Sequence, residues 1–293
     1  MRNTFIETLT EEAKINKKIV LIVGDLGYSV VEKFQELFPE RFFNAGIAEQ
    51  SMASMAAGLA SEGFHVFIYS IANFPTFRCA EQLRNDIGYH NLSVTIVTVG
   101  GGLSYGNLGY SHHAIQDLGL MRLFPEFDIV CPGDPLETIK SMKFLINNPG
   151  PSYLRLKKTG EKNYTSTIEN FQGGVWSEVI ATKNNKIFLT TSGGLDLANK
   201  IIQNNNEYKE FGIFTCPIWG AKYKQIQEKQ IEQFDEIITV EDHLLDGGFG
   251  TWLRESITKT HLHVKIQHRA LSQNVIGKVG SELYLLAEGG FKF

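Results

Sequence analysis

Hydrophobic residues along this chain fall into short unbroken runs separated by longer amphipathic stretches. Unbroken runs rich in Val and Ile are typical of buried strands, and apolar residues recurring every three or four positions indicate helices. Strands are predicted for IVLIVG after Lys18 and at His65–Tyr69, Ser93–Val99 and Phe127–Val130, with helices at Met1–Ile15, Ile47–Ala60, Phe77–Tyr89 and Pro135–Asn147. This alternation predicts a mainly parallel sheet covered by helices on both faces.

A polar stretch without clear periodicity, KKTGEKNYTSTIENFQ at Lys157–Gln172, interrupts the alternation. Few large apolar residues and no period are typical of an exposed linker. After it, strands are predicted at Lys186–Thr190, Phe211–Thr215 and Ile237–Val240, and helices at Leu195–Gln203 and Phe249–Thr258. The chain is therefore predicted to be α/β, with two three-layer domains at residues 1–160 and 175–293, the second smaller, joined by a linker at 161–174.

Composition narrows the class of protein. The 293 residues are 43% hydrophobic and 20% charged, which is enough apolar material for real cores and argues against disorder. With 28 Lys and Arg against 32 Asp and Glu, the net charge of −4 gives no broad surface for nucleic acid or anionic membrane. We therefore expect neither as a partner.

The cysteines and the N-terminal segment indicate the compartment. Cys79, Cys131 and Cys216 are far apart and form no CxxC pair, so neither a disulfide framework nor a zinc site is supported. The first residues include acidic side chains where a signal peptide needs an apolar run, and no stretch approaches the roughly 20 apolar residues that span a bilayer. We expect a cytoplasmic protein.

The segment NAGIAEQSMASMAAG at Asn44–Gly58 is the most informative for chemistry. A Gly-Ile-Ala turn opens a helix with Glu49 in its first turn and alanines along one face, which allows a backbone or a flat ligand to approach closely. A carboxylate at that position also complements the helix dipole by about a few tenths of a kcal/mol. From these residues alone, both interpretations of Glu49 stay open.

The motif GIAEQ at Gly46–Gln50 resembles the signature of the pyrimidine-binding domain in thiamine-diphosphate enzymes of the transketolase family. Further resemblances follow in order along nearly the whole chain: ASEGFHVFIYSIANF, GNLGYSHHAIQD at Gly106–Asp117, FPEFDIVCPGDPLE, GPSYLRLKK at Gly150–Lys158 and ITVEDHLLDGGFG at Ile238–Gly250. The resemblance implies a pyrimidine-binding domain with a mainly parallel sheet, followed by a transketolase C-terminal-like domain.

The resemblance also implies which residues hold the cofactor. Glu49 corresponds to the carboxylate that hydrogen-bonds the aminopyrimidine ring and stabilises its imino tautomer, and Phe74 to the aromatic side chain that stacks on the ring. Ile47 and Arg78 are further candidates for cofactor binding. Without the resemblance, Phe74 next to Pro75 is equally well interpreted as a core aromatic residue.

Substrate-binding residues are implied in the same way. His112 corresponds to the substrate-facing histidine, which works near its natural pKa as a proton donor, and His113 is an additional candidate. Lys158 stands where the family has an arginine near a sugar phosphate. Ser29 and Arg2 are further candidates for phosphate or subunit contacts, although lone cationic side chains are usually solvated.

Two departures from the family limit what the resemblance implies. Leu108 replaces the usual Asp before the histidine, and Tyr110 replaces a Pro, so sugar stereochemistry cannot be transferred. The family's Mg²⁺-diphosphate signature, Gly-Asp-Gly followed later by Asn-Asn, has no counterpart: Gly-Asp occurs only in Gly24-Asp25-Leu26 and Gly133-Asp134-Pro135. No metal ligands are expected in this chain.

These observations predict the C-terminal subunit of a split transketolase, with catalytic residues Glu49 and His112. Thiamine diphosphate would be shared with a separate N-terminal subunit that also binds Mg²⁺, in an α2β2 heterotetramer acting on sugar phosphates. The predicted reaction moves a two-carbon ketol unit from a ketose phosphate to an aldehyde. The alternatives are the β subunit of a 2-oxo-acid dehydrogenase, a deoxyxylulose-phosphate-synthase module, and a non-catalytic protein that kept the fold.

Overall fold

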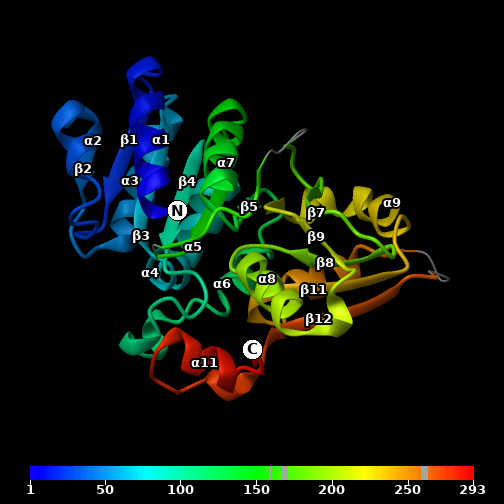
Figure 1. Ribbon diagram of the computed structural model, residues 1–293. Helices are drawn as coiled ribbons and strands as arrows, with labels where there is room; N and C mark the ends of the chain where they lie inside the picture. The colour runs from blue at the N-terminus through cyan, green and yellow to red at the C-terminus, as the bar shows by residue number, and fades with distance from the viewer. Residues whose placement is uncertain (159, 167–170, 259–262) are drawn as a thin grey trace.

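Seven strands, six of them before residue 160 and β10 from later in the chain, form one sheet with the order β10-β5-β6-β4-β3-β1-β2 (Figure 1). The computed structural model describes all 293 residues except 159, 167–170 and 259–262. All neighbouring strands are parallel except β10, which runs antiparallel to β5. The strands are β1 (Ile19–Val23), β2 (Phe42–Asn44), β3 (His65–Ile71), β4 (Val94–Val99), β5 (Asp128–Val130), β6 (Ser152–Leu156) and β10 (Ile218–Trp219).

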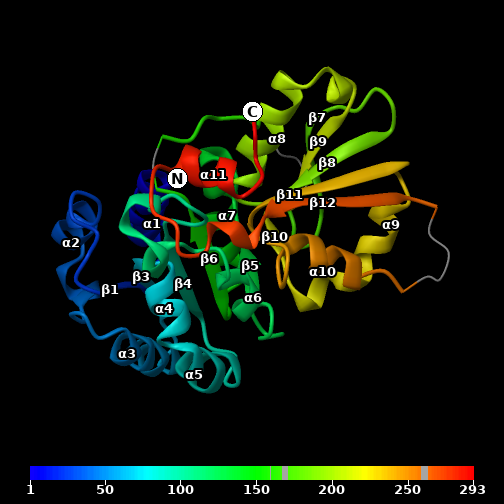
Figure 2. The ribbon, with the colours of Figure 1, turned by 90° about the horizontal axis from the view of Figure 1, so that it is seen from below.

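Helices bury both faces of this sheet (Figures 1 and 2). Successive side chains of a strand point to opposite faces, so Val20 and Ile22 of β1 join one apolar cluster while Ile19, Leu21 and Val23 join another. One face is covered by α1 (Arg2–Ile15), α2 (Glu32–Leu37) and α7 (Pro135–Asn147), and the other by α3 (Glu49–Ser61), α4 (Asn73–Phe77), α5 (Ala80–Gln82) and α6 (Asp117–Met121). Burial on both sides explains why these strands are continuously apolar.

The second half forms a five-stranded sheet with the order β12-β11-β8-β9-β7, parallel except where β7 meets β9. Helices α8 and α11 contribute to the cluster on one face, and α9 and α10 to the cluster on the other. The elements are β7 (Ser177–Ile180), β8 (Lys186–Thr190), α8 (Gly194–Asn204), β9 (Gly212–Thr215), α9 (Gln227–Ile231), β11 (Glu236–Leu244), α10 (Phe249–Glu255), β12 (Lys265–Leu271) and α11 (Glu282–Glu288).

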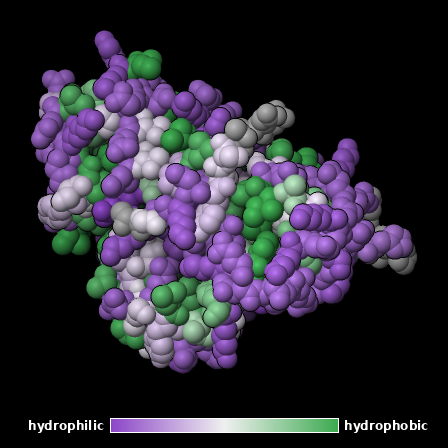
Figure 3. Space-filling model, in the orientation of Figure 1, coloured by the Kyte–Doolittle hydropathy of each residue, from purple (hydrophilic) through white to green (hydrophobic). Residues whose placement is uncertain are grey.

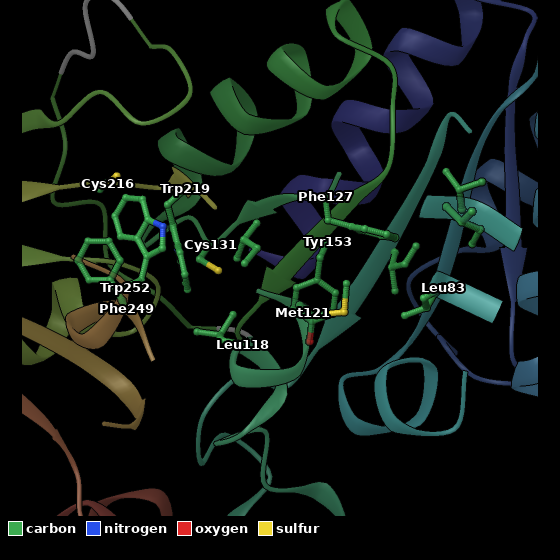
Figure 4. Close-up of a cluster of buried hydrophobic side chains, with 14 of the residues drawn as sticks. Leu83, Leu118, Met121, Phe127, Cys131, Tyr153, Cys216, Trp219, Phe249 and Trp252 are labelled. Atoms are coloured by element: carbon green, nitrogen blue, oxygen red, sulfur yellow. The ribbon is translucent and has the colours of Figure 1, made fainter. Parts of the chain in front are cut away.

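The two sheets share one hydrophobic cluster (Figure 4). Trp219, at the end of β10, packs against Phe249 and Trp252 with ring centroids 5.5 and 5.3 Å apart, and all three side chains are fully buried. Cys131, which follows β5, belongs to the same cluster. The short strand β10 therefore forms the edge strand of the first sheet, and its Trp219 packs against aromatic side chains of the second half of the chain.

The predicted α/β class and its mainly parallel sheets are confirmed. Helix α7 and strand β8 have the predicted bounds, and β11 is longer than the predicted Ile237–Val240. The single helix predicted at Phe77–Tyr89 is wrong, because this segment divides into the end of α4, the short α5 and a π-helical turn, η2, at Leu83–Gly88. Cys79 has non-helical backbone angles (φ −107°, ψ 12°), which breaks the first helix from the second.

The predicted division at residues 161–174 stays a prediction. Residues 161–166 and 171–174 contain no helix or strand, and residues 167–170 of the predicted linker lie outside the described residues. The three cysteines are free and buried. Among the described residues, no helix has both the length and the apolar character needed to cross a membrane. The face in Figure 3 is mostly hydrophilic, with hydrophobic side chains in small separate groups.

Replacing Trp219 with Ala should lower the free energy of unfolding by about 3–5 kcal/mol, because a fully buried indole shared by both sheets leaves a large cavity. Urea unfolding followed by circular dichroism measures this loss. Tyr28→Ala is the control, since that side chain is 76% exposed and should change stability by no more than about 0.5 kcal/mol. Equal effects of the two substitutions would contradict the shared core.

Candidate active site

Most of the predicted site residues lie at one edge of the first sheet, where parallel strands end. Glu49 is the first residue of α3, which follows β2, and Phe74 lies in α4, which follows β3. His112 lies in the loop between β4 and α6. Because the carboxyl ends of parallel strands meet at one edge, segments far apart in sequence come together there.

Glu49 is a buried carboxylate with one charged partner. Its side chain is 6% exposed, and Arg78 Nη1 donates to Glu49 Oε1 at 2.8 Å. The Arg78 side chain itself is half exposed. Glu49 and Arg78 line an open cavity of about 340 Å³ together with Ile47, which is 79% exposed. The carboxylate is thus buried yet borders open space.

Arg78 links Glu49 to two aromatic rings. The Arg78 guanidinium carbon lies 4.2 Å from the centroid of the half-buried Phe74 ring. The Phe74 ring in turn meets the His112 ring edge-on, with centroids 5.3 Å apart. Phe74 and Arg78 also border a second cavity, of about 360 Å³, which His113 lines. The structure therefore brings Glu49, Arg78, Phe74 and His112 into one continuous chain of contacts.

The side chain of His112 is oriented by Ser111, and its surroundings favour the neutral imidazole. Ser111 Oγ lies 3.0 Å from His112 Nδ1, which leaves Nε2 available to a ligand. Burial lowers the pKa of His112 below the ordinary value of 6.5, and the charges of His113 and Arg78 act in the same direction. The imidazole is therefore mainly neutral at neutral pH.

A cationic group lies on the other side of His112. The Tyr105 ring is 6.3 Å from the His112 ring, and the exposed Lys158 ammonium lies 5.4 Å from the Tyr105 centroid. Burial raises the pKa of Tyr105, and the nearby Arg2 guanidinium opposes that rise. Arg2 Nε is buried and has no hydrogen-bond partner among the described residues. Arg2 and Lys158 thus approach the site from separate parts of the chain.

Two predicted residues differ from the rest in their placement. Ser29 is exposed, with a left-handed backbone (φ 62°) in the loop after β1, and its amide donates to Glu32 Oε1 at 2.5 Å. Within the described part of the chain, this is a local bond on the loop that leads into α2, and it does not connect Ser29 to Glu49, Phe74 or His112. His113 is buried, and its Nε2 lies 3.1 Å from the carbonyl oxygen of Gly106. His113 therefore belongs to the interior of the loop that carries His112.

Three further residues shape the site without having been predicted from the sequence. The Asn73 side-chain amide donates to the carbonyl oxygens of Ser111 and His113, at 3.1 and 3.0 Å, and so fixes this loop against α4. Tyr105 and Ser111 contact His112 as described above. Asn73 directly precedes Phe74, but nothing in the local sequence indicates a bond to a segment about 40 residues away.

Comparison with known proteins identifies the family. Residues 1–161 match the sequence family described as the transketolase pyrimidine-binding domain. The chain belongs to the transketolase family. It is 32% identical over 288 residues to a putative transketolase C-terminal section of Methanocaldococcus jannaschii, covering 98% of this chain and 90% of that protein. It is also 32% identical over 274 residues to a subunit of the apulose-4-phosphate transketolase of Phocaeicola vulgatus, covering 90% of this chain and 86% of that subunit.

Longer relatives and solved structures agree with this assignment. The 1-deoxy-D-xylulose-5-phosphate synthase of Clostridium kluyveri is 28% identical over 273 residues, which are 90% of this chain but 43% of that protein. A split-gene transketolase, solved as an inactive β4 tetramer, has a TM-score of 0.83 and 26% identity, covering 99% of this chain and 93% of that one. Transketolase from Campylobacter jejuni shares the fold, with a TM-score of 0.83 at 18% identity, and 44% of it is covered.

Family membership implies thiamine diphosphate as the cofactor, and the site fits its pyrimidine half. A ring with hydrogen-bonding nitrogens needs a carboxylate and an aromatic face beside open space, which are the features of Glu49, Phe74 and the two cavities. Arg78 contacts both Glu49 and Phe74. Over the residues that the structure describes, no three His, Cys, Asp or Glu side chains gather as a possible metal site.

The pKa of His112 should lie below 6.5 and should rise when Arg78 is replaced with Met. Met keeps an apolar stem near Phe74 but removes a positive charge that disfavours protonation of His112. Titration of the imidazole by NMR, assigned with His112→Gln, measures both values. Arg84→Met is the control: Arg84 donates to Asn85 on η2, and it is not among the groups that lower the His112 pKa. A wild-type pKa at or above 6.5 would contradict the described environment.

Proposed function

We propose that this chain is one subunit of a two-chain, thiamine-diphosphate-dependent transketolase. The reaction would transfer a two-carbon ketol unit from a ketose phosphate to an aldehyde acceptor. The observation that carries this proposal is the unbroken series of contacts from the buried Glu49 through Arg78 and Phe74 to His112. This series places a carboxylate, Glu49, an aromatic ring, Phe74, and an imidazole, His112, at the same edge of the first sheet.

Glu49 and Phe74 would hold the aminopyrimidine ring, with Ile47 and Arg78 at its border. When bound, thiamine diphosphate supplies the nucleophilic carbon that allows a bond next to a carbonyl carbon to be broken and reformed. The task of Glu49 is to hold a proton at the ring nitrogen, and its burial keeps that hydrogen bond away from competing water. Phe74 would hold the ring flat by stacking, which is worth about 1 kcal/mol beyond its burial.

His112 would exchange protons with the substrate oxygens. Its lowered pKa keeps it neutral near pH 7, and when the Ser111 hydroxyl donates to Nδ1, the proton lies on Nε2, from which it can be donated. Lys158 and Arg2, which lie near Tyr105, would attract the phosphate group of a substrate. Support for a phosphorylated ketose comes also from the relative named for apulose-4-phosphate. Ser29 and His113 are further proposed substrate contacts.

A separate subunit would supply the diphosphate-binding half and its Mg²⁺, with thiamine diphosphate lying between the two chains in an α2β2 assembly. The names of two relatives, one a C-terminal section and the other one subunit of a transketolase, support the division into two chains. Exposed apolar side chains at the site edge also support it, since Ile47 is 79% and Phe77 46% exposed. Apolar groups gathered around a site are often covered by another chain.

A deoxyxylulose-phosphate-synthase-type reaction is the second candidate, because several such synthases match this chain at 27–30% identity. The β-subunit role in a 2-oxo-acid dehydrogenase is a third. Both are tested by supplying pyruvate in place of the ketose phosphate, with an aldehyde phosphate for the first and an artificial electron acceptor for the second. Turnover only with the ketose phosphate would exclude both.

Activity should require the second subunit and thiamine diphosphate together. The isolated chain is expected to be inactive, and mixing it with a diphosphate-domain subunit, Mg²⁺ and thiamine diphosphate should give ketol transfer, measured by consumption of the ketose phosphate. Omitting thiamine diphosphate should abolish turnover. Full activity of the isolated chain would refute the two-chain arrangement.

Glu49→Gln should lower kcat of the reconstituted enzyme at least about 100-fold, because an amide cannot hold the proton as a carboxylate does. Glu36→Gln is the control, since Glu36 is an exposed glutamate on α2, which covers the opposite face of the sheet. Circular dichroism of both variants checks that the fold is retained. A Glu49→Gln enzyme with near-normal turnover would remove Glu49 from its proposed role.

A further inference from the structure

Residues of both halves of the chain hold the loop that carries His112. We propose that Arg155 and Asp242 are positioning residues, which keep His112 in place by fixing the base of its loop. This inference rests on the proposed function, because it gives His112 its role in proton exchange. In this proposal Asp242, on a strand of the second sheet, affects the reaction through Arg155, on a strand of the first sheet.

Arg155 lies on β6 and is completely buried. Its Nε donates to Asp117 Oδ2 at 2.9 Å, and its Nη1 donates to Asp242 Oδ1 at 2.7 Å and to Ser192 Oγ at 2.6 Å. Asp117 belongs to the first sheet unit, whereas Ser192 and Asp242 belong to the second. A single guanidinium thus pairs with carboxylates from both units.

The same guanidinium holds the loop backbone directly. Arg155 Nη2 donates to the carbonyl oxygen of Ala114 at 2.7 Å, only two residues after His112. Ala114 and Gly102 exchange both backbone hydrogen bonds, at 2.9 and 3.0 Å, which closes the base of the loop. Asp117 then begins α6, and its carboxylate also accepts from the Tyr153 hydroxyl at 2.7 Å. The loop therefore begins and ends on the Arg155 network.

Two glycines lie close to the carboxylate of Asp242. A Cβ added at Gly102 would collide with Asp242 Oδ2, and one added at Gly193 would collide with the same atom. Gly102 also has a positive φ of 67°, which favours glycine. Two glycines from different units thus enclose one carboxylate.

The second unit also holds the loop at two other points. The Leu244 amide, at the end of β11, donates to the Ile115 carbonyl oxygen at 3.0 Å. Near the tip, the Gly280 amide donates to the Gly106 carbonyl oxygen at 3.3 Å, and His113 Nε2 lies 3.1 Å from that same oxygen. Figure 1 shows α11 beside this loop, consistent with these bonds. His112 lies between the two attachments, so loosening either would move it.

The experiment uses the reconstituted two-subunit complex with Asp242→Asn, which keeps the shape and one acceptor but removes the charge that faces Arg155. We expect kcat to fall about 10- to 100-fold with a smaller change in KM for the ketose phosphate, because misplacing a reacting group by about 1 Å costs roughly that much. We also expect the NMR-measured pKa of His112 to rise towards 6.5 as the loop opens to water.

Glu241→Gln is the matched control. Glu241 is the adjacent residue on β11 and equally buried, but its carboxylate accepts from the amides of Phe249 and Gly250, within the second unit. This substitution should disturb the second unit while leaving the His112 pKa unchanged. Equal shifts of the His112 pKa in both variants would mean that the effect is general destabilisation, and would overturn the proposal.

A folded Asp242→Asn complex with unchanged kcat and unchanged His112 pKa would also overturn the proposal. If that variant does not assemble, Ser192→Ala removes one acceptor of Arg155 with a smaller disturbance, and an unchanged His112 pKa there would count against the proposal equally. The titration needs no turnover. A wild-type complex without ketol transfer would therefore refute the proposed function, while the titration would still test the positioning of His112.

Discussion

The structure depends on one buried positive charge. Arg155 is fully buried, and it is compatible with the interior only because it pairs with the carboxylates of Asp117 and Asp242, and backbone and hydroxyl oxygens accept its remaining N–H groups. Removing one partner of such a pair typically costs about 3–5 kcal/mol, since the other charge is left buried and unpaired. Because the two carboxylates come from different sheet units, the relative position of these units is fixed by electrostatics as well as by apolar packing.

The candidate site lies at one edge of the first sheet, and Arg155 bonds the loop that carries His112 there. Parallel strands deliver Glu49, Phe74 and His112 to one edge from three separate connections. Glu49 lies at the first turn of a helix, whereas His112 lies on a loop and depends on other segments for its position. This difference explains why the hydrogen bonds of Asn73 and Arg155 converge on the His112 loop, while Glu49 is held by its own helix.

The sequence pattern predicted correctly those helices and strands whose bounds depend on residues within the same segment. The bounds of α7 follow from Asp134, whose side chain accepts from the Glu137 amide at the helix start, and β8 follows from an unbroken apolar run. The two-residue β10 could not be predicted, because its pairing with β5 is decided by a segment almost 90 residues away. In the same way, the local sequence does not indicate the role of Arg155, since its partners are separated from it by 37 to 87 residues. The residues of the transketolase motif are recognisable because their types and their order along this chain resemble those of the family.

Strand β10 has a consequence for how the protein is made. The first sheet receives its last strand from Ile218–Trp219, well beyond the 161 residues that match the pyrimidine-binding family. During synthesis, the ribosome must therefore add about 60 further residues before that sheet can be completed. Until then the open edge of β5 is an unpaired row of backbone groups, which is the kind of edge that other chains can join.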